Sequence, residues 1–367
     1  MTKNLDKEGL RSIADNYDLF YIDLWGVIHN GIKLHEQAVI ALKELIKMNK
    51  DFVLLTNAPR PNFTVKKFLE KMGLDEKIRS HVFTSGEAAL NYLRKFYLSD
   101  KFFHIGPFRD FDLFSEFKNN KSKDLKDSKY LLCSGLFEEH DKDLNYYKEL
   151  LEKYIDKKMI CTNPDLIVDR GNVRELCAGS VAMVFEKIGG EVIYFGKPYP
   201  EVYNQSIDNV KKRILSIGDN LNTDIKGANI LNYHSLLISN GVHREEIKEK
   251  GVDEVSKQYE AIVNYIQSDL KWVTLYKNFN IKKNHRGSII LIGNFDGVHI
   301  GHQKLFRLAQ SYKKKYNSKI GVINFDPFPK MFFNKSLKNF RLSSMKQKLN
   351  LLNDLGIDFI VTKKFDK

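Results

Sequence analysis

Four short apolar runs in the sequence are each followed by side chains that could take part in chemistry. Each run has the length of a buried parallel strand, and open α/β sheets bind their ligands outside the carboxyl ends of such strands. The side chains that follow these runs are, in chain order, Asp23, Thr56, Lys197, Asp219 and Asp224. Taken singly, Asp23 could simply end a strand and Thr56 could cap a helix. Their recurrence in one order predicts a shared site.

This combination of side chains suits phosphoryl transfer. A carboxylate that attacks phosphorus approaches a group that is itself negative, so it needs a divalent cation to screen charge and a fixed ammonium to hold the oxygens. Lys197 would supply the ammonium, and Thr56 and Asn57 would donate hydrogen bonds to the transferring group. Hard oxygen ligands suited to Mg²⁺ would come from Asp23, Asp219 and Asp224. We therefore expect Mg²⁺ as cofactor and a phosphorylated small molecule as substrate.

The elements around Asp23 are predicted from turn chemistry and from apolar periodicity. Asn30-Gly31 predicts a type I′ turn, which would make residues 25–33 a small flap beside the site. A helix is expected over residues 35–50, because its apolar residues recur on one face: Ala38, Ala41, Leu42, Leu45 and Ile46. The site is thus expected between a flap and the first helix of an α/β domain.

The strand–helix alternation restarts near residue 81 with shorter, more polar segments and then returns to the first pattern. Residues 191–195 are expected as a strand of the first domain, and the loop Thr162-Asn-Pro-Asp165 is expected to point back at its site. The predicted organisation is a Rossmann-like parallel-sheet core (1–80 and 180–245), an inserted α/β cap (81–179), a helical linker (246–286) and a further α/β domain (287–367).

A second candidate site begins after the apolar run 288–292. His299 and His302 lie three apart at a predicted helix start, so both rings fall on one face beside free backbone N–H groups. Gly301 lets a phosphate approach the backbone, and the helix dipole adds attraction. Such a site would stabilise charge on a nucleoside triphosphate that is attacked at its α-phosphorus. The other residues expected to bind the nucleotide are Gly293, Asn294, Phe295 and Asp296.

Composition and charge limit the class of protein. With 367 residues, 43% of them hydrophobic and 29% charged, the chain is expected to fold into two or three globular domains. The formal charge is +13, but the lysines are spread along the chain with acidic neighbours, which is typical of solvated surfaces. We expect anionic small molecules rather than nucleic acid as partners. A nucleic-acid binder remains the alternative, and it would show steep salt dependence.

Three cysteines and the absence of long apolar segments indicate the compartment. Cys133, Cys161 and Cys177 are widely spaced and lack a Cys-x-x-Cys pair, so we expect buried thiols in a reducing compartment rather than disulfides or a zinc site. Residues 1–17 are charged and contain no apolar signal region, and no apolar run reaches the length of a membrane span. We therefore expect a cytoplasmic protein that does not contact membranes.

The residues of the first site resemble those of the haloacid dehalogenase-like phosphatases of class IIA, over residues 19–241. Thr162-Asn-Pro-Asp165 and Gly196-Lys-Pro198 are similar to features of that class in particular. The resemblance implies a mobile α/β cap and a nucleophile, Asp23, that becomes an aspartyl-phosphate. It further implies that Thr56 belongs to the second motif of the family, Lys197 to the third, and Asp219 with Asp224 to the acidic, metal-binding fourth.

One position departs from that family. Its phosphatases usually carry a second Asp, two residues after the nucleophile, that protonates the leaving oxygen, whereas this chain has Trp25 there. Loss of general acid–base help typically costs about 10²–10⁴-fold in rate. Three interpretations stay open: a leaving group that needs no proton, His29 as a substitute acid, or a phosphate-binding and scaffolding domain with little turnover.

The second site resembles the adenylyltransferase module of bacterial FAD synthetases. Residues 293–302 match its first motif, residues 320–333 resemble its next strand and loop with Phe328 where a His is usual, and residues 341–364 resemble the following helix and strand. The resemblance implies ATP and FMN as substrates. The family's later Ser/Thr/Arg-rich motif and its riboflavin kinase domain do not appear before Lys367, so we expect a truncated module. The expected whole is a bifunctional flavin-pathway protein.

Overall fold

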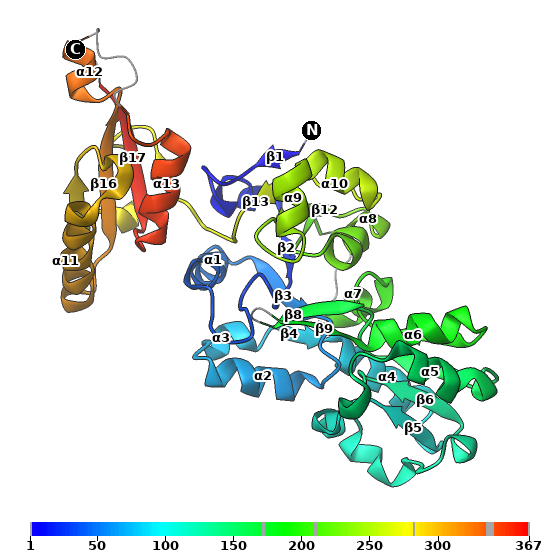
Figure 1. The fold of residues 1–367 in the computed structure, drawn as a ribbon. Coiled ribbons are helices and arrows are strands. Elements are labelled where there is room, and N and C mark those ends of the chain that lie inside the picture. The colour runs from blue at the N-terminus through cyan, green and yellow to red at the C-terminus, as the bar shows by residue number, and fades with distance from the viewer. Residues whose placement is uncertain (1, 171–172, 208–211, 282, 335–340, 366–367) are drawn as a thin grey trace. The chain divides into compact units, whose positions relative to one another are not determined.

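A computed structural model of the chain describes residues 2–170, 173–207, 212–281, 283–334 and 341–365 (Figure 1). The chain forms two compact units, one built on residues 1–3 and 16–269 and the other on residues 4–15 and 270–367. Both units contain parallel sheets with helices packed on them, so the predicted α/β class is confirmed. Among the described residues, no helix is long and apolar enough to span a bilayer.

The core of the first unit is a seven-stranded sheet in the order β1-β13-β12-β11-β2-β3-β4. The neighbours from β13 to β4 pair in parallel, and the register sets Ile22 beside Leu54 on one side and Ile217 on the other. All four residues of β2 are buried, as expected of a central parallel strand. The strands are β1 (Lys3–Asn4), β2 (Leu19–Ile22), β3 (Asp51–Thr56), β4 (Val82–Thr84), β11 (Ile214–Gly218), β12 (His234–Ile238) and β13 (Tyr265–Gln267).

Helices connect these strands. The first of them confirms the predicted helix, since α1 (Glu36–Lys47) buries Ala38, Ala41, Leu42 and Leu45. The remaining helices of this part are α2 (Asn62–Lys71), α3 (Glu76–Arg79), α4 (Ser85–Phe96), α7 (Pro200–Ser206), η7 (Leu221–Ile225), α8 (Lys226–Ile230), α9 (Arg244–Lys250) and α10 (Val252–Gln258). The short helical turns η1 (Leu10–Ser12) and η2 (Ala14–Asn16) fall in or at the end of the segment 4–15, which belongs to the other unit.

The inserted cap has its own parallel sheet, in the order β10-β7-β6-β5. Its strands are β5 (Phe102–Ile105), β6 (Tyr130–Cys133), β7 (Lys158–Cys161) and β10 (Glu191–Tyr194), and β8 (Ile167–Arg170) and β9 (Val173–Leu176) form an antiparallel hairpin. The helices are η3 (Phe108–Asn120), η4 (Leu125–Asp127), η5 (Glu138–His140), α5 (Leu144–Leu151), η6 (Glu152–Tyr154) and α6 (Ala178–Lys187). The three cysteines are buried free thiols, as predicted.

Strand β10 lies in a different sheet from the one predicted. The sequence analysis placed it in the core, but it pairs in parallel with β7, with Glu191 beside Lys158 and Tyr194 beside Cys161. An apolar run fits either sheet equally well, so periodicity cannot identify its neighbour. The loop that carries Lys197 therefore follows the last strand of the cap.

The cap and the core also share one hydrophobic cluster. Core residues such as Tyr21 and Leu55 belong to the same cluster as the cap residues Phe102, Tyr130 and Ile160. Interiors packed in this way resist relative displacement of their parts. Cap and core are thus held together by more than their connecting chains.

The segment predicted as a helical linker is largely part of the core. Strand β13 extends the core sheet beside β12, and Val255 of α10 packs with Leu221 and Leu237 in a satellite cluster. A strand of three residues is too short to leave a periodic pattern, which explains why the sequence analysis missed it.

The C-terminal unit contains a parallel sheet in the order β14-β17-β16-β15. Its strands are β14 (Leu275–Tyr276), β15 (Ile289–Ile292), β16 (Ile320–Asp326) and β17 (Phe359–Lys364), and its helices are η8 (Lys283–His285), η9 (Asp296–Val298), α11 (Ile300–Tyr316), α12 (Pro329–Phe333) and α13 (Met345–Asp354).

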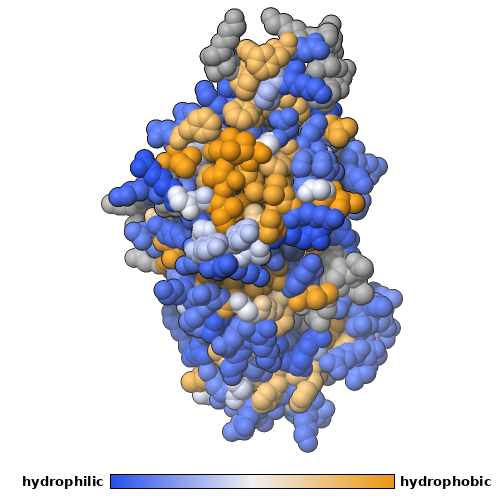
Figure 2. Space-filling view, turned by 90° about the vertical axis from the view of Figure 1, so that its left-hand side faces the viewer, coloured by the Kyte–Doolittle hydropathy of each residue, from blue (hydrophilic) through white to orange (hydrophobic). Residues whose placement is uncertain are grey.

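Figure 2 shows apolar side chains gathered on one face of the molecule. In this unit, Ile292 of the edge strand β15 and Ile300 and Leu308 of α11 are exposed.

Candidate functional site

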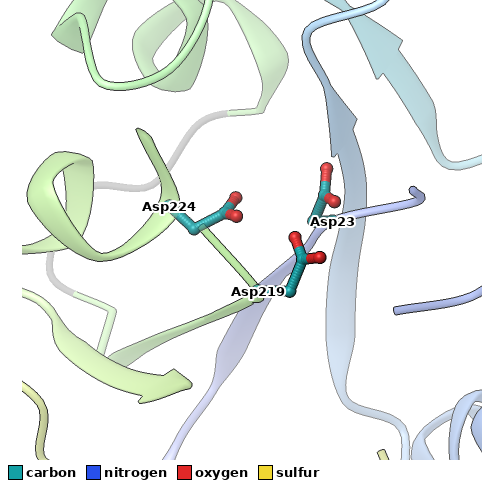
Figure 3. A group of neighbouring side chains, drawn as sticks. All are labelled: Asp23, Asp219 and Asp224. Carbon is teal, nitrogen blue, oxygen red and sulfur yellow. The ribbon is translucent and has the colours of Figure 1, made fainter. Parts of the chain in front are cut away.

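Three carboxylates meet at the carboxyl ends of neighbouring core strands. Asp23 follows β2, Asp219 follows the adjacent strand β11, and Asp224 lies in the turn η7 (Figure 3). Each offers one oxygen within 4.8 Å of an oxygen of the others, and all three side chains are buried. Parallel pairing of β2 with β11 is the reason, since it puts both strand ends at one edge of the sheet. The structure thus brings together the three carboxylates that the sequence analysis grouped.

One buried ammonium lies among these carboxylates. Lys197 Nζ donates hydrogen bonds to Asp23 Oδ1 at 2.5 Å and to Asp224 Oδ1 at 2.7 Å. A third carboxylate oxygen, Asp219 Oδ2, accepts from the backbone N–H of Val242 at 3.1 Å. One ammonium cannot neutralise three buried carboxylates, so the pocket favours a further cation.

Burial and mutual repulsion shift the pKa values in this pocket. Burial raises the pKa of Asp23 to about 7; Lys197 opposes this rise and Asp224 adds to it. Burial, Asp23 and Asp224 likewise raise the pKa of Asp219 well above its usual range. The pKa of Lys197 is raised, because the attraction of Asp224 and Asp23 outweighs the effect of burial. These pKa shifts indicate a pocket with an excess of buried negative charge, which would bind a divalent cation through hard oxygen ligands.

Glycines make room for the carboxylates. A Cβ on Gly26, whose φ is 78°, or on Gly241 would lie 2.1 Å from Asp219 Oδ2, and a Cβ on Gly218 would lie 2.0 Å from Asp224 Cγ. Real Cβ atoms do not approach so closely, so these positions require glycine. The sequence analysis did not single out Gly26 or Gly241, because their role depends on contacts with a distant strand end.

The loop after β3 holds the lysine through a side-chain amide. Asn57 Oδ1 accepts from the Lys197 backbone N–H at 2.7 Å, and Asn57 Nδ2 donates to the Lys197 carbonyl and to Asp165 Oδ1, both at 3.0 Å. Asp165 belongs to the cap loop that was predicted to point at the site. Burial raises its pKa to about 6, although Lys197 and Asn57 favour the ionised form. The sequence analysis expected Asn57 to donate to the transferring group, whereas its amide donates to Lys197 and Asp165 in this structure. Thr56 lies buried beside it and accepts from the Ala58 N–H.

The flap that begins at Trp25 is held together by contacts among its own side chains. His29 is buried, its Nδ1 accepts from the Gly31 N–H at 3.0 Å, and its ring packs edge-on against Trp25 with centroids 5.1 Å apart. Burial lowers the pKa of His29 to about 4, which keeps it neutral and disfavours it as a substitute acid. The turn is not type I′, because Gly31 has a positive φ and Asn30 does not; Asn30 Oδ1 instead accepts from the N–H groups of Ile32 and Lys33.

In the C-terminal unit, His299 and His302 stack at the start of α11. Their ring centroids are 3.7 Å apart, and His299 Nδ1 accepts from the His302 N–H at 3.4 Å, which caps the helix. Burial and the neighbouring His299 lower the pKa of His302. A Cβ on Gly301 would lie 3.2 Å from the His299 ring. Both rings therefore lie together at the positive end of a long helix.

The turn before this helix is held by Asp296. Its Oδ1 accepts from the N–H and the hydroxyl of Ser343, and its Oδ2 accepts from the Leu342 N–H. Burial opposes ionisation of Asp296, but these hydrogen bonds outweigh it and lower the pKa. The carboxylate thus serves the turn itself, while Gly293, Asn294 and Phe295 form the loop between β15 and η9.

Comparison with known proteins identifies the first unit. Residues 20–117 match the family model described as haloacid dehalogenase-like hydrolase, and residues 194–268 match the one described as HAD-hydrolase-like. A solved hydrolase of the haloacid dehalogenase-like family from Brucella suis 1330 is 30% identical, with a TM-score of 0.58 over 64% of this chain and 90% of that one. A possible sugar phosphatase of the same superfamily from Cytophaga hutchinsonii, 21% identical, has a TM-score of 0.60 over 72% of this chain and 97% of that one.

The C-terminal segment matches a second family. Residues 281–367 match the model described as FAD synthetase. The bifunctional riboflavin kinase/FMN adenylyltransferase of Buchnera aphidicola subsp. Acyrthosiphon pisum is 36% identical over 88 residues, which are 24% of this chain and 28% of that protein. The Escherichia coli K12 protein of the same name is 36% identical over 81 residues, 22% of this chain and 26% of that protein. The chain thus spans little more than a quarter of these relatives. Through its first unit it belongs to the haloacid dehalogenase-like hydrolase family, and it carries a C-terminal segment of the FAD synthetase type.

Proposed function

We propose that the first unit is a Mg²⁺-dependent phosphohydrolase that works through an aspartyl-phosphate at Asp23. The observation that carries this proposal is the buried cluster in which Lys197 bridges Asp23 and Asp224 beside Asp219. Asp23, Asp219 and Asp224 would hold Mg²⁺, which would screen the negative charge of the incoming phosphate.

The protein's own groups then divide the work. A carboxylate oxygen of Asp23 attacks phosphorus, the bond from phosphorus to the leaving oxygen breaks, and that oxygen keeps the electron pair. The backbone N–H and carbonyl of Lys197 are hydrogen-bonded to the Asn57 side chain, and its ammonium keeps a positive charge beside the phosphoryl oxygens. Water then attacks the aspartyl-phosphate, releases inorganic phosphate and restores the carboxylate.

Trp25 narrows the class of substrate. An indole cannot give up a proton near neutral pH, and the neutral, buried His29 is a poor donor. The leaving group must therefore carry its negative charge unaided, which favours aryl phosphates, acyl phosphates and phosphoanhydrides over alkyl phosphates.

Replacing Trp25 by Asp tests this limit. We expect Trp25→Asp to raise the turnover of alkyl phosphates by about 10²-fold, because a proton donor restores acid catalysis, and to leave the turnover of p-nitrophenyl phosphate nearly unchanged. Steady-state kinetics on matched alkyl and aryl esters would measure both. Trp25→Phe is the control, because it keeps an aromatic ring without adding an acid. Equal changes for both ester classes would contradict the assignment.

Metal binding is expected to depend on pH through Asp23. Since its pKa is raised to about 7 and that of Asp219 is raised as well, Mg²⁺ must displace protons from these ligands below that pH, and its affinity should fall by at least about tenfold per unit from pH 6 downward. A raised carboxyl pKa stabilises the metal-free fold at low pH, and this contribution is lost as pH rises through about 7. Metal-free protein should thus be more stable at pH 6 than at pH 8, and Mg²⁺ should raise its Tm more at pH 8. Thermal shifts measured across a Mg²⁺ titration at both pH values would check this, and an equal Mg²⁺ response at both would refute it.

The second candidate function for this unit is a phosphate-binding scaffold without turnover, which the loss of the acid at Trp25 favours. Beryllium fluoride distinguishes the two. A Mg²⁺-dependent beryllium fluoride adduct at Asp23, detected by native mass spectrometry and by an increase in Tm, supports the phosphohydrolase. Phosphate binding without such an adduct supports the scaffold.

For the C-terminal unit we propose a part in the transfer of AMP from ATP to FMN. The stacked His299 and His302 at the start of α11, together with the match to FAD synthetases, support this role. The test is FAD formation from ATP and FMN by the purified chain, followed by chromatography. A parallel reaction with an active FAD synthetase serves as the positive control and confirms that the assay conditions permit FAD formation.

A further inference from the structure

Two neighbouring strands of the C-terminal unit carry, two residues before their carboxyl ends, buried polar groups that have no hydrogen-bond partner within the described part of the chain. Asn324 on β16 is completely buried, and neither its amide nitrogen nor its amide oxygen makes a hydrogen bond. Thr362 is its register partner on β17, and its buried hydroxyl is also unpartnered. An unsatisfied buried amide destabilises a fold, so its presence needs an explanation.

Both side chains point to the side of the sheet that the helices cover. Val322 and Ile360 lie in one hydrophobic cluster with Phe306 of α11 and Leu349 of α13. Side chains alternate along a strand, so Asn324 and Thr362, each two residues further on, continue on that same face. They lie near the carboxyl ends of their parallel strands, which is where open α/β sheets bind ligands.

A buried ammonium lies on α13, the helix whose Leu349 packs on this face. Lys348 is 1% exposed, and its Nζ has no hydrogen-bond partner among the described residues. It lies 4.2 Å from the centre of the Phe328 ring, which covers it. The nearby charges are already engaged, since Arg341 pairs with Asp326 and Asp296 accepts from Ser343 and Leu342. Burial lowers the pKa of Lys348 to about 8, which an anionic ligand oxygen would reverse.

We infer that Asn324, Thr362 and Lys348 bind a substrate of the C-terminal unit through a heterocyclic edge with adjacent hydrogen-bond donor and acceptor atoms and through an anionic oxygen. An asparagine amide pairs with such an edge through both of its polar atoms. Flavin and adenine rings both present one, and both occur in phosphorylated form. Binding requires the Phe328 side chain to move off Lys348. This inference rests on the proposed nucleotide-transfer role of the unit.

Asn324→Leu separates a binding role from a structural one, because the two predict opposite signs. Leucine has nearly the same size and removes the unsatisfied amide, so the Tm of the variant without ligand should rise by several degrees. The same variant should lose about 10- to 100-fold in affinity for the ligand whose ring Asn324 contacts. The measurements are thermal unfolding of the full chain and titrations with riboflavin, FMN and ATP, followed by flavin fluorescence and calorimetry.

The titrations identify the ring. Loss of riboflavin and FMN affinity assigns the flavin, and loss of ATP affinity assigns the adenine; Lys348→Met should weaken FMN or ATP binding but not riboflavin binding. Ser318→Ala is the matched control, since its hydroxyl is also buried and unpartnered but precedes β16 at the opposite end of the strand. It should change no affinity.

The outcomes are distinct. A lowered Tm for Asn324→Leu shows that internal hydrogen bonds, such as those to a bound water, satisfy the amide, and this overturns the inference. Unchanged affinities in a variant whose parent binds FMN or ATP also overturn it. If the parent chain binds none of these ligands, the proposed nucleotide-transfer role fails first, and this inference fails with it.

Discussion

Asp23→Asn is expected to lower phosphatase turnover by about 10⁴-fold or more, with the protein still folded. The amide has nearly the same shape but cannot act as the nucleophile, and removal of a nucleophile costs on this order in enzymes that form covalent intermediates. The variant should also have a higher Tm than the parent in metal-free buffer at pH 8. Above about pH 7 the Asp23 carboxylate is ionised in a buried site, where the cost of burial and the repulsion of Asp224 outweigh the attraction of Lys197, and the neutral amide removes this cost. Turnover of p-nitrophenyl phosphate and thermal unfolding with and without Mg²⁺ measure both effects.

Asp18→Asn provides the matched control for this substitution. Asp18 precedes β2, whereas Asp23 follows it, and its exposed carboxylate pairs with Arg213 at 2.8 Å. Its replacement should leave turnover within about twofold, because exposed ion pairs contribute little. Residual turnover above a hundredth of the parent value in Asp23→Asn would argue that a group other than Asp23 attacks phosphorus.

Lys197→Met is expected to destabilise the metal-free protein by about 3–5 kcal/mol and to reduce turnover by at least about 10²-fold. The substitution keeps the length of the side chain but leaves Asp23 and Asp224 buried without their cation, which is the costly way to break a buried ion pair. Saturating Mg²⁺ should recover part of the stability but not the turnover, because the ion compensates charge at the carboxylates. Urea unfolding with and without Mg²⁺ would measure this.

Lys212→Met is its control. Lys212 forms a surface ion pair with Asp51 at 2.8 Å, so its loss should cost less than about 1 kcal/mol. Introducing Asp23→Asn into Lys197→Met should restore stability, since it removes one of the two carboxylates left unpaired. If the double variant is as unstable as Lys197→Met alone, packing of the lysine stem rather than charge is its contribution.

The strand-end chemistry could be predicted from the sequence because it depends on local signals. An apolar run of strand length followed by Asp or Lys is visible without a fold, and parallel strands necessarily place such ends at one edge. For this reason the sequence alone is enough to group Asp23, Asp219, Asp224 and Lys197, which the structure brings together. Helix α1 was equally accessible, since its buried stripe follows the helical period.

Contacts between distant segments could not be predicted in the same way. The hydrogen bonds that Asn57 forms with Lys197 and with Asp165 join the core, the loop after β10 and the cap, and no periodicity links these positions. The need for glycine at 26 and 241 likewise arises only when Asp219 is placed beside them. The unpartnered amide of Asn324 is also invisible in sequence, where it is one polar residue near the end of an apolar strand.

The position of β10 has a practical consequence for anyone who recombines these domains. A chimera that exchanges residues 97–179, which begin after α4, would replace β5, β6 and β7 but keep the native β10 as their edge partner, so the foreign sheet would have to fit a strand selected for another neighbour. Lys197 lies only three residues after the end of β10, so a displaced β10 would also displace this lysine. Grafts that take the donor sequence through Phe195 keep the whole sheet of one origin, and they move the junction onto the glycine at 196, whose φ of 124° already suits a bend in the chain.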